Sequence, residues 1–110
     1  MSKDILRLQG GIIARIALKR RNNYDVSGSF KKYAFKATVY DTNKTCGIMG
    51  SRITGLEMWR AKKTITGYIK VFPILCCHNG NWTLKARSGN DYNASCDLIY
   101  VLNQMLPKSP

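Results

Sequence analysis

Hydrophobic and polar residues alternate along several stretches of the chain, and this alternation predicts β-strands. The most regular stretch is 31–40, whose apolar face carries Tyr33, Phe35, Ala37 and Val39. Residues 12–19 alternate in the same way, with Ile12, Ala14, Ile16 and Leu18 on one face. A helix over residues 3–21 would hold Gly10 and Gly11 in its interior at a cost of about 1 kcal/mol each. A strand is therefore favoured for 12–19.

The middle of the chain predicts further strands separated by turns. Residues 22–29 are polar and predict a loop, and residues 41–44 predict a turn before a glycine-interrupted strand over 45–53. Residues 59–72 form a long β-like stretch, which would turn these residues inward: Ile65, Gly67, Ile69 and Val71.

Three signals organise the last third of the chain. Pro73 lacks a backbone N–H and predicts a sheet edge or a bend, and Asn79-Gly80 predicts a hairpin turn before a strand over 82–86. Residues 88–91 offer a helix N-cap, and apolar residues then follow at helical spacing until Pro107 ends the helix: Leu98, Val101, Leu102 and Met105.

These elements predict an α+β fold. We expect a mostly antiparallel β-sheet of about five or six strands, with a C-terminal α-helix that packs on the sheet or on a dimer partner. The 110 residues fit a single domain, residues 1–110, with the sheet over about 12–86 and the helix over about 91–106.

The charge balance is the unusual feature of the composition. Eighteen Lys and Arg residues stand against six Asp and Glu residues, for a formal net charge of +12. Such an excess indicates a polyanionic partner, either a nucleic acid or an acidic protein or membrane surface. The apolar runs are too short to span a membrane and the N-terminal residues lack a signal-peptide core, so we expect a cytoplasmic protein without a membrane partner.

The cations recur at even spacings along the predicted strands, so each strand would present them from one face. With neighbouring Thr and Tyr side chains, they predict a nucleic-acid-binding sheet face in which cations neutralise phosphates and tyrosines stack on unpaired bases. The predicted binding residues are Arg15, Lys19, Lys32, Lys36, Tyr40, Lys62, Thr64, Thr66, Tyr68 and Lys70.

The sequence contains few signals of a catalytic or metal-binding site. The single histidine, His78, lies in a predicted turn, the carboxylates are scattered, and no phosphate-binding loop or nucleophile elbow is present. Cys76, Cys77 and His78 are adjacent, but structural zinc ligands are usually two to four residues apart and strand neighbours point to opposite faces. We therefore expect no catalytic residues, no metal, no cofactor, no small-molecule substrate, and cysteines that are buried free thiols.

Two other functions fit the same charge. A small basic protein of a mobile element could inhibit or adapt an acidic host protein, and electrostatics would steer that association as well. A metal-independent ribonuclease toxin built from Lys, Arg, Tyr and one His leaves no compact motif. Binding to unrelated RNA or DNA at moderate salt would distinguish the nucleic-acid surface from the inhibitor.

Three segments, in the same order along the chain, resemble the coat proteins of single-stranded RNA bacteriophages. Lys31-Lys-Tyr-Ala-Phe-Lys36 resembles the central RNA-facing strand of that family. Trp59-Arg60 followed by Thr64-Ile65 resembles its last long strand, and Ser95-Cys-Asp-Leu-Ile99 with Leu102 and Leu106 resembles the start of its C-terminal helical region. Together the segments span less than a quarter of the chain.

The resemblance implies an obligate homodimer whose sheets join edge to edge and whose helices cross onto the partner. Dimers would assemble into a virion shell with the basic sheet face toward genomic RNA. Lys32 and Lys36 match RNA-facing positions of the central strand, as do Lys62, Thr64 and Thr66 in the last strand. Ala34 replaces a polar residue of the family pattern, which implies altered hairpin recognition. The dimer-packing residues would be Leu98, Leu102 and Met105.

Overall fold

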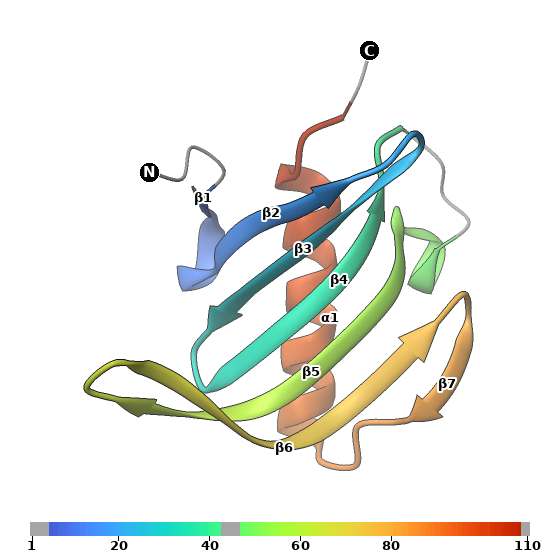
Figure 1. Cartoon of the computed structure of the whole chain (residues 1–110). Coiled ribbons are helices and arrows are strands. Elements are labelled where there is room, and N and C mark those ends of the chain that lie inside the picture. The colour runs from blue at the N-terminus through green and yellow to red at the C-terminus, as the bar shows by residue number, and fades with distance from the viewer. Residues whose placement is uncertain (1–4, 43–46, 109–110) are drawn as a thin grey trace.

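One antiparallel sheet and one helix make up the fold, as the computed structural model shows (Figure 1). The structure describes residues 5–42 and 47–108, without the side chains of Lys63 and Tyr68. Seven strands pair in chain order and precede helix α1: β1 (Ile5–Arg7), β2 (Ile13–Lys19), β3 (Asn23–Phe30), β4 (Tyr33–Tyr40), β5 (Ile53–Thr64), β6 (Gly67–His78), β7 (Asn81–Leu84) and α1 (Gly89–Met105). Short 3₁₀ turns occur at Gln9–Gly11 and Ile48–Gly50. The predicted α+β class is confirmed, with more strands than the five or six expected.

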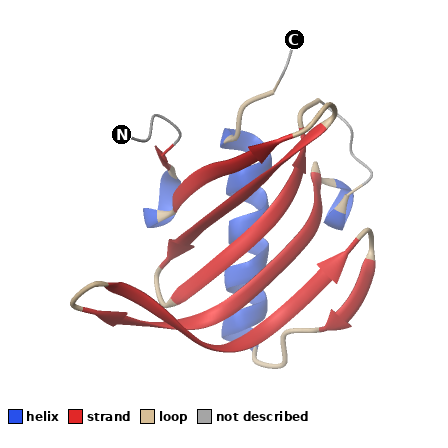
Figure 2. Ribbon diagram, in the orientation of Figure 1, coloured by secondary structure: helices blue, strands red, loops and turns tan. Residues whose placement is uncertain are grey.

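The helix lies along one side of the sheet, which gives the molecule a covered face and an open face (Figure 2). On the covered face, cross-strand neighbours such as Phe35, Met58 and Leu75 are almost fully buried. Leu98 and Leu102 of α1 complete this core with no exposed surface. Burial of one such aliphatic side chain stabilises the fold by about 1.5–3 kcal/mol, so this layer of contacts fixes the helix to the sheet.

These buried helix residues correct one expectation. Leu98 and Leu102 were predicted to pack against a dimer partner, but they are 0% exposed within the chain itself. Since α1 packs on the chain's own sheet, neither side chain has surface left for a partner. Met105, at the end of α1, is 45% exposed.

Strand β3 replaces the predicted polar loop over residues 22–29. Tyr24, Val26 and Phe30 point to the covered face and are buried, while the polar residues between them point to the open face. The polar half of this alternation gave the segment its loop-like composition. Gly28 is required in this strand, since a β-carbon there would overlap the Ile13 carbonyl group of β2.

The predicted stretch 59–72 is a hairpin rather than a single strand. Strands β5 and β6 turn at Ile65 and Thr66, and their paired ends project sideways beyond the rest of the sheet, away from α1 (Figure 1). The expectation that Ile65, Gly67, Ile69 and Val71 face inward is therefore wrong, because all four are exposed and none of the described elements covers the hairpin. The strand predicted over 45–53 is also wrong in its described part, since 47–52 form turns and β5 starts at Ile53.

Several local signals are confirmed. Asn79 and Gly80 have φ values of 51° and 84°, the left-handed pair that a two-residue hairpin turn needs. Pro73 lies where β6 is a sheet edge, because β7 pairs only with Cys76, Cys77 and His78. The Ser88 hydroxyl accepts a hydrogen bond from the Asp91 amide at 3.0 Å and caps α1.

Both ends of α1 are tied to the sheet by charged residues. At the N-terminal end, the Asp91 carboxylate accepts hydrogen bonds from the Tyr33 hydroxyl at 2.6 Å and from the Arg60 guanidinium at 3.3 Å. At the C-terminal end, the buried Arg52 guanidinium donates to the carbonyls of Tyr40, Asn103, Leu106 and Pro107. Each charge has the sign that the helix dipole favours at its end. Among the described residues, no helix is long and apolar enough to cross a membrane.

Candidate nucleic-acid interface

The open face gathers cations from three strands. Arg15 of β2 pairs with Ser27 of β3, which pairs with Lys36 of β4, and paired residues of antiparallel strands point to the same side. Arg15 and Lys36 are both exposed. Neighbouring strands lie about 4.8 Å apart, so the two cations stand about 10 Å from one another at the backbone, with a small hydroxyl residue between them.

Trp59 and Lys70 continue this face on β5 and β6. The Lys70 ammonium lies 3.9 Å from the centre of the Trp59 ring, which is a cation–π contact. Trp59 pairs with the small residue Ala34 of β4. A half-buried aromatic ring beside a cation is suited to stack on a base while the cation meets a phosphate.

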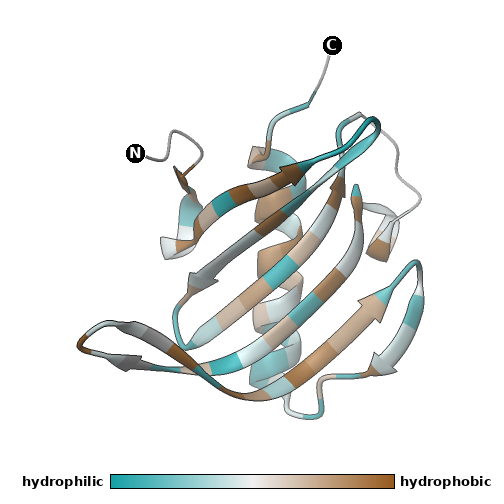
Figure 3. Ribbon diagram, viewed as in Figure 1, coloured by the Kyte–Doolittle hydropathy of each residue, from teal (hydrophilic) through white to brown (hydrophobic). Residues whose placement is uncertain are grey.

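The structure places four of the ten predicted binding residues on the open face. Arg15, Lys36, Tyr40 and Lys70 lie on strands with their side chains toward the open face, and hydrophilic and hydrophobic segments alternate along β4 and β5 accordingly (Figure 3). Tyr40 ends β4 and pairs with Asn23, at the far end of the face from Trp59.

Lys19 and Lys62 turn to the other side of the sheet. A β-bulge between Ile16 and Leu18 shifts the register, so Lys19 pairs with the covered-face residue Tyr24 instead of following Arg15. Lys62 pairs with Ile69 across the hairpin, one position out of phase with the Ala61–Lys70 pair. The expectation that Lys62 and Lys70 share a face is wrong because a turn separates them.

The remaining predicted residues lie at the ends of the sheet. Lys32 is in the β3–β4 turn and lines a hollow with Arg60 and Asn93, beside the N-terminal end of α1. The hydroxyl groups of Thr64 and Thr66 are 3.4 Å apart at the hairpin tip, where Thr64 also donates to the Gly67 carbonyl. The side chain of Tyr68 lies outside the described part of the structure.

The carboxylates of the open face are partly neutralised by their neighbours. Asp25 accepts two hydrogen bonds from the Arg20 guanidinium, at 2.8 and 2.7 Å, and one from the Thr38 hydroxyl at 3.2 Å. These contacts, the Arg20 hydrogen bonds first, hold the pKa of the Asp25 carboxyl below its ordinary value. Glu57 lies opposite Lys36 in the β4–β5 strand pairing. Arg7, Arg15, Arg20, Lys36 and Lys70 thus outnumber the two carboxylates, and the face keeps a positive potential.

A hollow of about 390 Å³ opens in the centre of this face. Arg20, Asp25, Lys36, Glu57 and His78 are among its lining residues. Its charged rim and open shape suit a polar ligand lying on the surface better than an enclosed apolar molecule.

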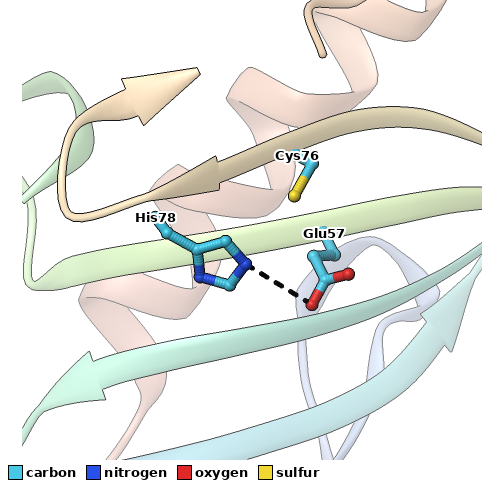
Figure 4. A group of neighbouring side chains, drawn as sticks. All are labelled: Glu57, Cys76 and His78. Carbon is cyan, nitrogen blue, oxygen red and sulfur yellow. Dashed lines mark ion pairs between the residues drawn. The ribbon is translucent and has the colours of Figure 1, made fainter. Parts of the chain in front are cut away.

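At the edge of the hollow, Glu57, Cys76 and His78 form a compact group (Figure 4). Their donor atoms lie within 4.8 Å of one another, and His78 Nε2 is 3.8 Å from Glu57 Oε1. Cys76 pairs with Glu57, and His78 follows two residues later on the same side of β6. Nitrogen, sulfur and oxygen donors in one place are the ligand types that bind zinc and similar ions. They are the residues of the described chain that could hold a metal.

Sequence reasoning missed several residues of this face. Arg20 was assigned to a basic run before a loop, and the bidentate contact with Asp25 appears only once β3 pairs with β2. Trp59 carried part of the resemblance but was given no binding role. Even spacing from Lys70 could not reveal it, because the β5–β6 turn lies between these residues along the chain and a register shift separates their strand pairs.

No known protein family, characterised protein or solved structure matches this chain. The class of the protein therefore follows from the fold alone. It is an α+β protein with a single antiparallel sheet, one face packed on a helix and one face open.

Proposed function

We propose that the protein binds single-stranded RNA through the open face of its sheet and that it acts as a structural rather than a catalytic protein. The observation that carries the proposal is the placement of Arg15, Lys36 and Lys70 with Trp59 on one uncovered sheet surface. Single-stranded nucleic acid is bound by this combination of cations along a strand path and an aromatic ring for base stacking.

The sign and distribution of charge support a polyanion as partner. The chain has a formal charge of +12, and the Asp25 carboxylate on the open face is already paired with Arg20. Each phosphate neutralised releases counterions, so affinity should fall steeply with salt. An uncovered sheet face can contact the accessible bases of a single RNA strand, whereas the bases of an RNA duplex lie in a deep, narrow major groove that side chains cannot read.

The resemblance to RNA phage coat proteins adds assembly to the proposal. In that form, copies of the chain associate and enclose RNA on their open faces. Exposed apolar residues of the β5–β6 hairpin, such as Ile69, Val71 and Phe72, supply surface for contacts between copies. Helix α1 stays on its own sheet in this arrangement, unlike the helix exchange that the resemblance implies.

The test is RNA affinity in two matched charge reversals. We would measure fluorescence anisotropy of a labelled single-stranded RNA with the full chain, with Arg15→Glu/Lys36→Glu, and with Lys85→Glu/Arg87→Glu. The second pair changes the net charge equally, but its residues follow β7 outside the strands, and Lys85 lines a hollow beside α1. Circular dichroism would establish that all three proteins are folded.

We expect the open-face pair to weaken binding by more than about 100-fold and to lower the salt slope by about 1.4, the value for two phosphate contacts on a single strand. The control pair should lose much less. Equal losses in both variants would assign binding to bulk charge, and unchanged binding in the open-face variant would refute the proposed surface.

Particle size tests assembly separately. Light scattering and the ratio of absorbance at 260 and 280 nm on the purified protein should give large particles that contain RNA. A small species that carries RNA would refute assembly into a shell and remain consistent with the proposed RNA-binding face. A small species without nucleic acid that also shows no RNA binding by anisotropy would refute both assembly and RNA binding. That result would favour a basic protein inhibitor.

A further inference from the structure

We infer that Glu57, Cys76 and His78 form a binding site for one divalent transition-metal ion of the zinc class, at the edge of the open-face hollow. The inference does not rest on RNA binding, since it concerns only how three donor side chains converge. Their donor atoms, from two adjacent strands, all lie within 4.8 Å of one another (Figure 4).

Strand geometry explains why these residues meet. Cys76 and Glu57 are directly paired across β6 and β5, and strand residues two apart share a face, which brings His78 to the same side. Residue 55, opposite His78, is glycine, so no side chain stands between the imidazole and Glu57. Cys77, between the two ligands, points to the covered face and is 0% exposed.

The spacing of the donor atoms is close to that of a metal centre. Zinc binds sulfur, nitrogen and oxygen ligands at about 2.0–2.3 Å in a tetrahedron, so its ligands stand about 3.5 Å from each other. His78 Nε2 and Glu57 Oε1 are already 3.8 Å apart. Small side-chain rotations would bring the group together without moving the strands.

The donors are also available for binding. Among the residues described, no side-chain hydrogen bond engages the Cys76 thiol, the Glu57 carboxylate or the His78 ring, apart from the loose contact between His78 and Glu57. Cys76 and Glu57 are half-buried and His78 is exposed, so an ion can enter from solvent.

A cation, Lys36, and a second carboxylate, Asp25, line the same hollow as Glu57 and His78. Lys36 lies opposite Glu57 in the strand pairing, while the Asp25 carboxylate on the rim of the same hollow is hydrogen-bonded to Arg20. Cys76 would bind as thiolate, with its proton released to solvent as the sulfur–metal bond forms. Three protein ligands leave a fourth position toward the hollow, open to water or to an anionic group.

The test is a cobalt titration of the reduced, metal-free full chain, followed by visible and near-ultraviolet absorption. We expect one equivalent of Co²⁺ to produce a thiolate-to-cobalt charge-transfer band and the intense d–d bands of a tetrahedral site, and Zn²⁺ to abolish both. Cys76→Ser should lose the charge-transfer band. Glu57→Gln and His78→Ala should each weaken cobalt binding by at least about tenfold.

Cys96→Ser is the matched control, because Cys96 is a half-buried thiol on α1, outside the group. It should bind cobalt as the unmodified chain does. The inference is overturned if tetrahedral bands are absent, if Cys96→Ser removes the charge-transfer band, or if both Glu57→Gln and His78→Ala bind cobalt normally. The last result would reduce the site to a single thiol. Circular dichroism of each variant separates loss of a ligand from loss of the fold.

Discussion

The Arg52 guanidinium donates a hydrogen bond at 2.8 Å to the carbonyl of Leu106, the C-cap residue of helix α1. Arg52 is 2% exposed, and its Nε atom has no hydrogen-bond partner among the described residues. No basic residue occupies the last turn of α1. A side chain from the segment before β5 therefore supplies the positive charge that the carboxyl end of the helix favours.

Replacing Arg52 should lower the free energy of unfolding more than replacing an exposed arginine does. Arg52→Met leaves helix-end carbonyls buried without donors, and we expect the free energy of unfolding to fall by about 3 kcal/mol. Arg87→Met, at an exposed position, should change it by less than about 0.5 kcal/mol. Urea denaturation monitored by circular dichroism measures both. A loss below about 1 kcal/mol for Arg52→Met would show that water or a rearranged helix end replaces the guanidinium.

Tyr33 should make the fold sensitive to alkali. Burial, followed by the hydrogen bond to Asp91, raises the pKa of the Tyr33 hydroxyl to about 12. Between pH 10 and that value, the unfolded tyrosine loses its proton while the folded one keeps it, so stability falls as the pH rises. The stability advantage of the unmodified chain over Tyr33→Phe should therefore shrink by about 2 kcal/mol from pH 9 to about pH 12. An advantage that is independent of pH would contradict the raised pKa.

Asp25 should have the opposite dependence, on the acid side. Its pKa is lowered chiefly by the Arg20 hydrogen bonds, so its stabilising contribution is present above the ordinary carboxyl pKa and is lost as the pH falls through the folded value. A carboxyl titration by NMR should place the Asp25 pKa below the usual range. Arg20→Met should raise that pKa more than Thr38→Val does. The reverse order would make the threonine the main partner.

Gly28 is the glycine whose replacement should be costly. A β-carbon there would meet the Ile13 carbonyl oxygen and lie 2.9 Å from the Ile13 carbonyl carbon, so β2 and β3 would have to separate. We expect Gly28→Ala to destabilise the fold by about 2–4 kcal/mol. Gly89→Ala, at the start of α1 with open space around it, should be neutral or slightly stabilising. Thermal unfolding of the two variants provides the comparison, and equal stability would contradict the predicted clash.

Tryptophan fluorescence should report which face meets RNA. The chain has two tryptophans, so Trp82→Phe leaves only Trp59 as emitter and Trp59→Phe leaves only Trp82. Trp59 lies on the open face beside Lys70, whereas Trp82 lines a hollow with Tyr92 of α1. Single-stranded RNA should quench Trp59 emission by base stacking and leave Trp82 emission almost unchanged. Quenching of Trp82 alone would indicate that RNA binds on the helix side of the sheet.

Local signals in the sequence predicted much of the fold, because each acts over a few residues. The alternation in 31–40, the Asn79-Gly80 turn and the Ser88 cap need no knowledge of distant partners, and all three are confirmed. Strand β3 was missed because its polar residues fall on the open face, where a strand tolerates them.

The candidate site was harder to predict because it depends on register. One extra residue at a β-bulge turns every following side chain to the opposite face, and such irregularities fall near Ala17, Val71 and Ile74. Lys19 left the expected surface for this reason. The meeting of Glu57 with Cys76 and His78 likewise requires the pairing of β5 with β6, which adjacency along the chain does not reveal.

The order of the elements has a consequence for folding during synthesis. Every strand pairs with its neighbour in the chain, so the sheet can grow strand by strand as the polypeptide emerges. Its covered face, however, remains in water until residues 89–105 are made and dock as α1. During that interval Phe35, Leu56 and Met58 are available to other hydrophobic surfaces. The hydrophobic core is therefore complete only after the seventeen residues of α1 have left the exit tunnel, and a chain stalled before that point would be a substrate for chaperones.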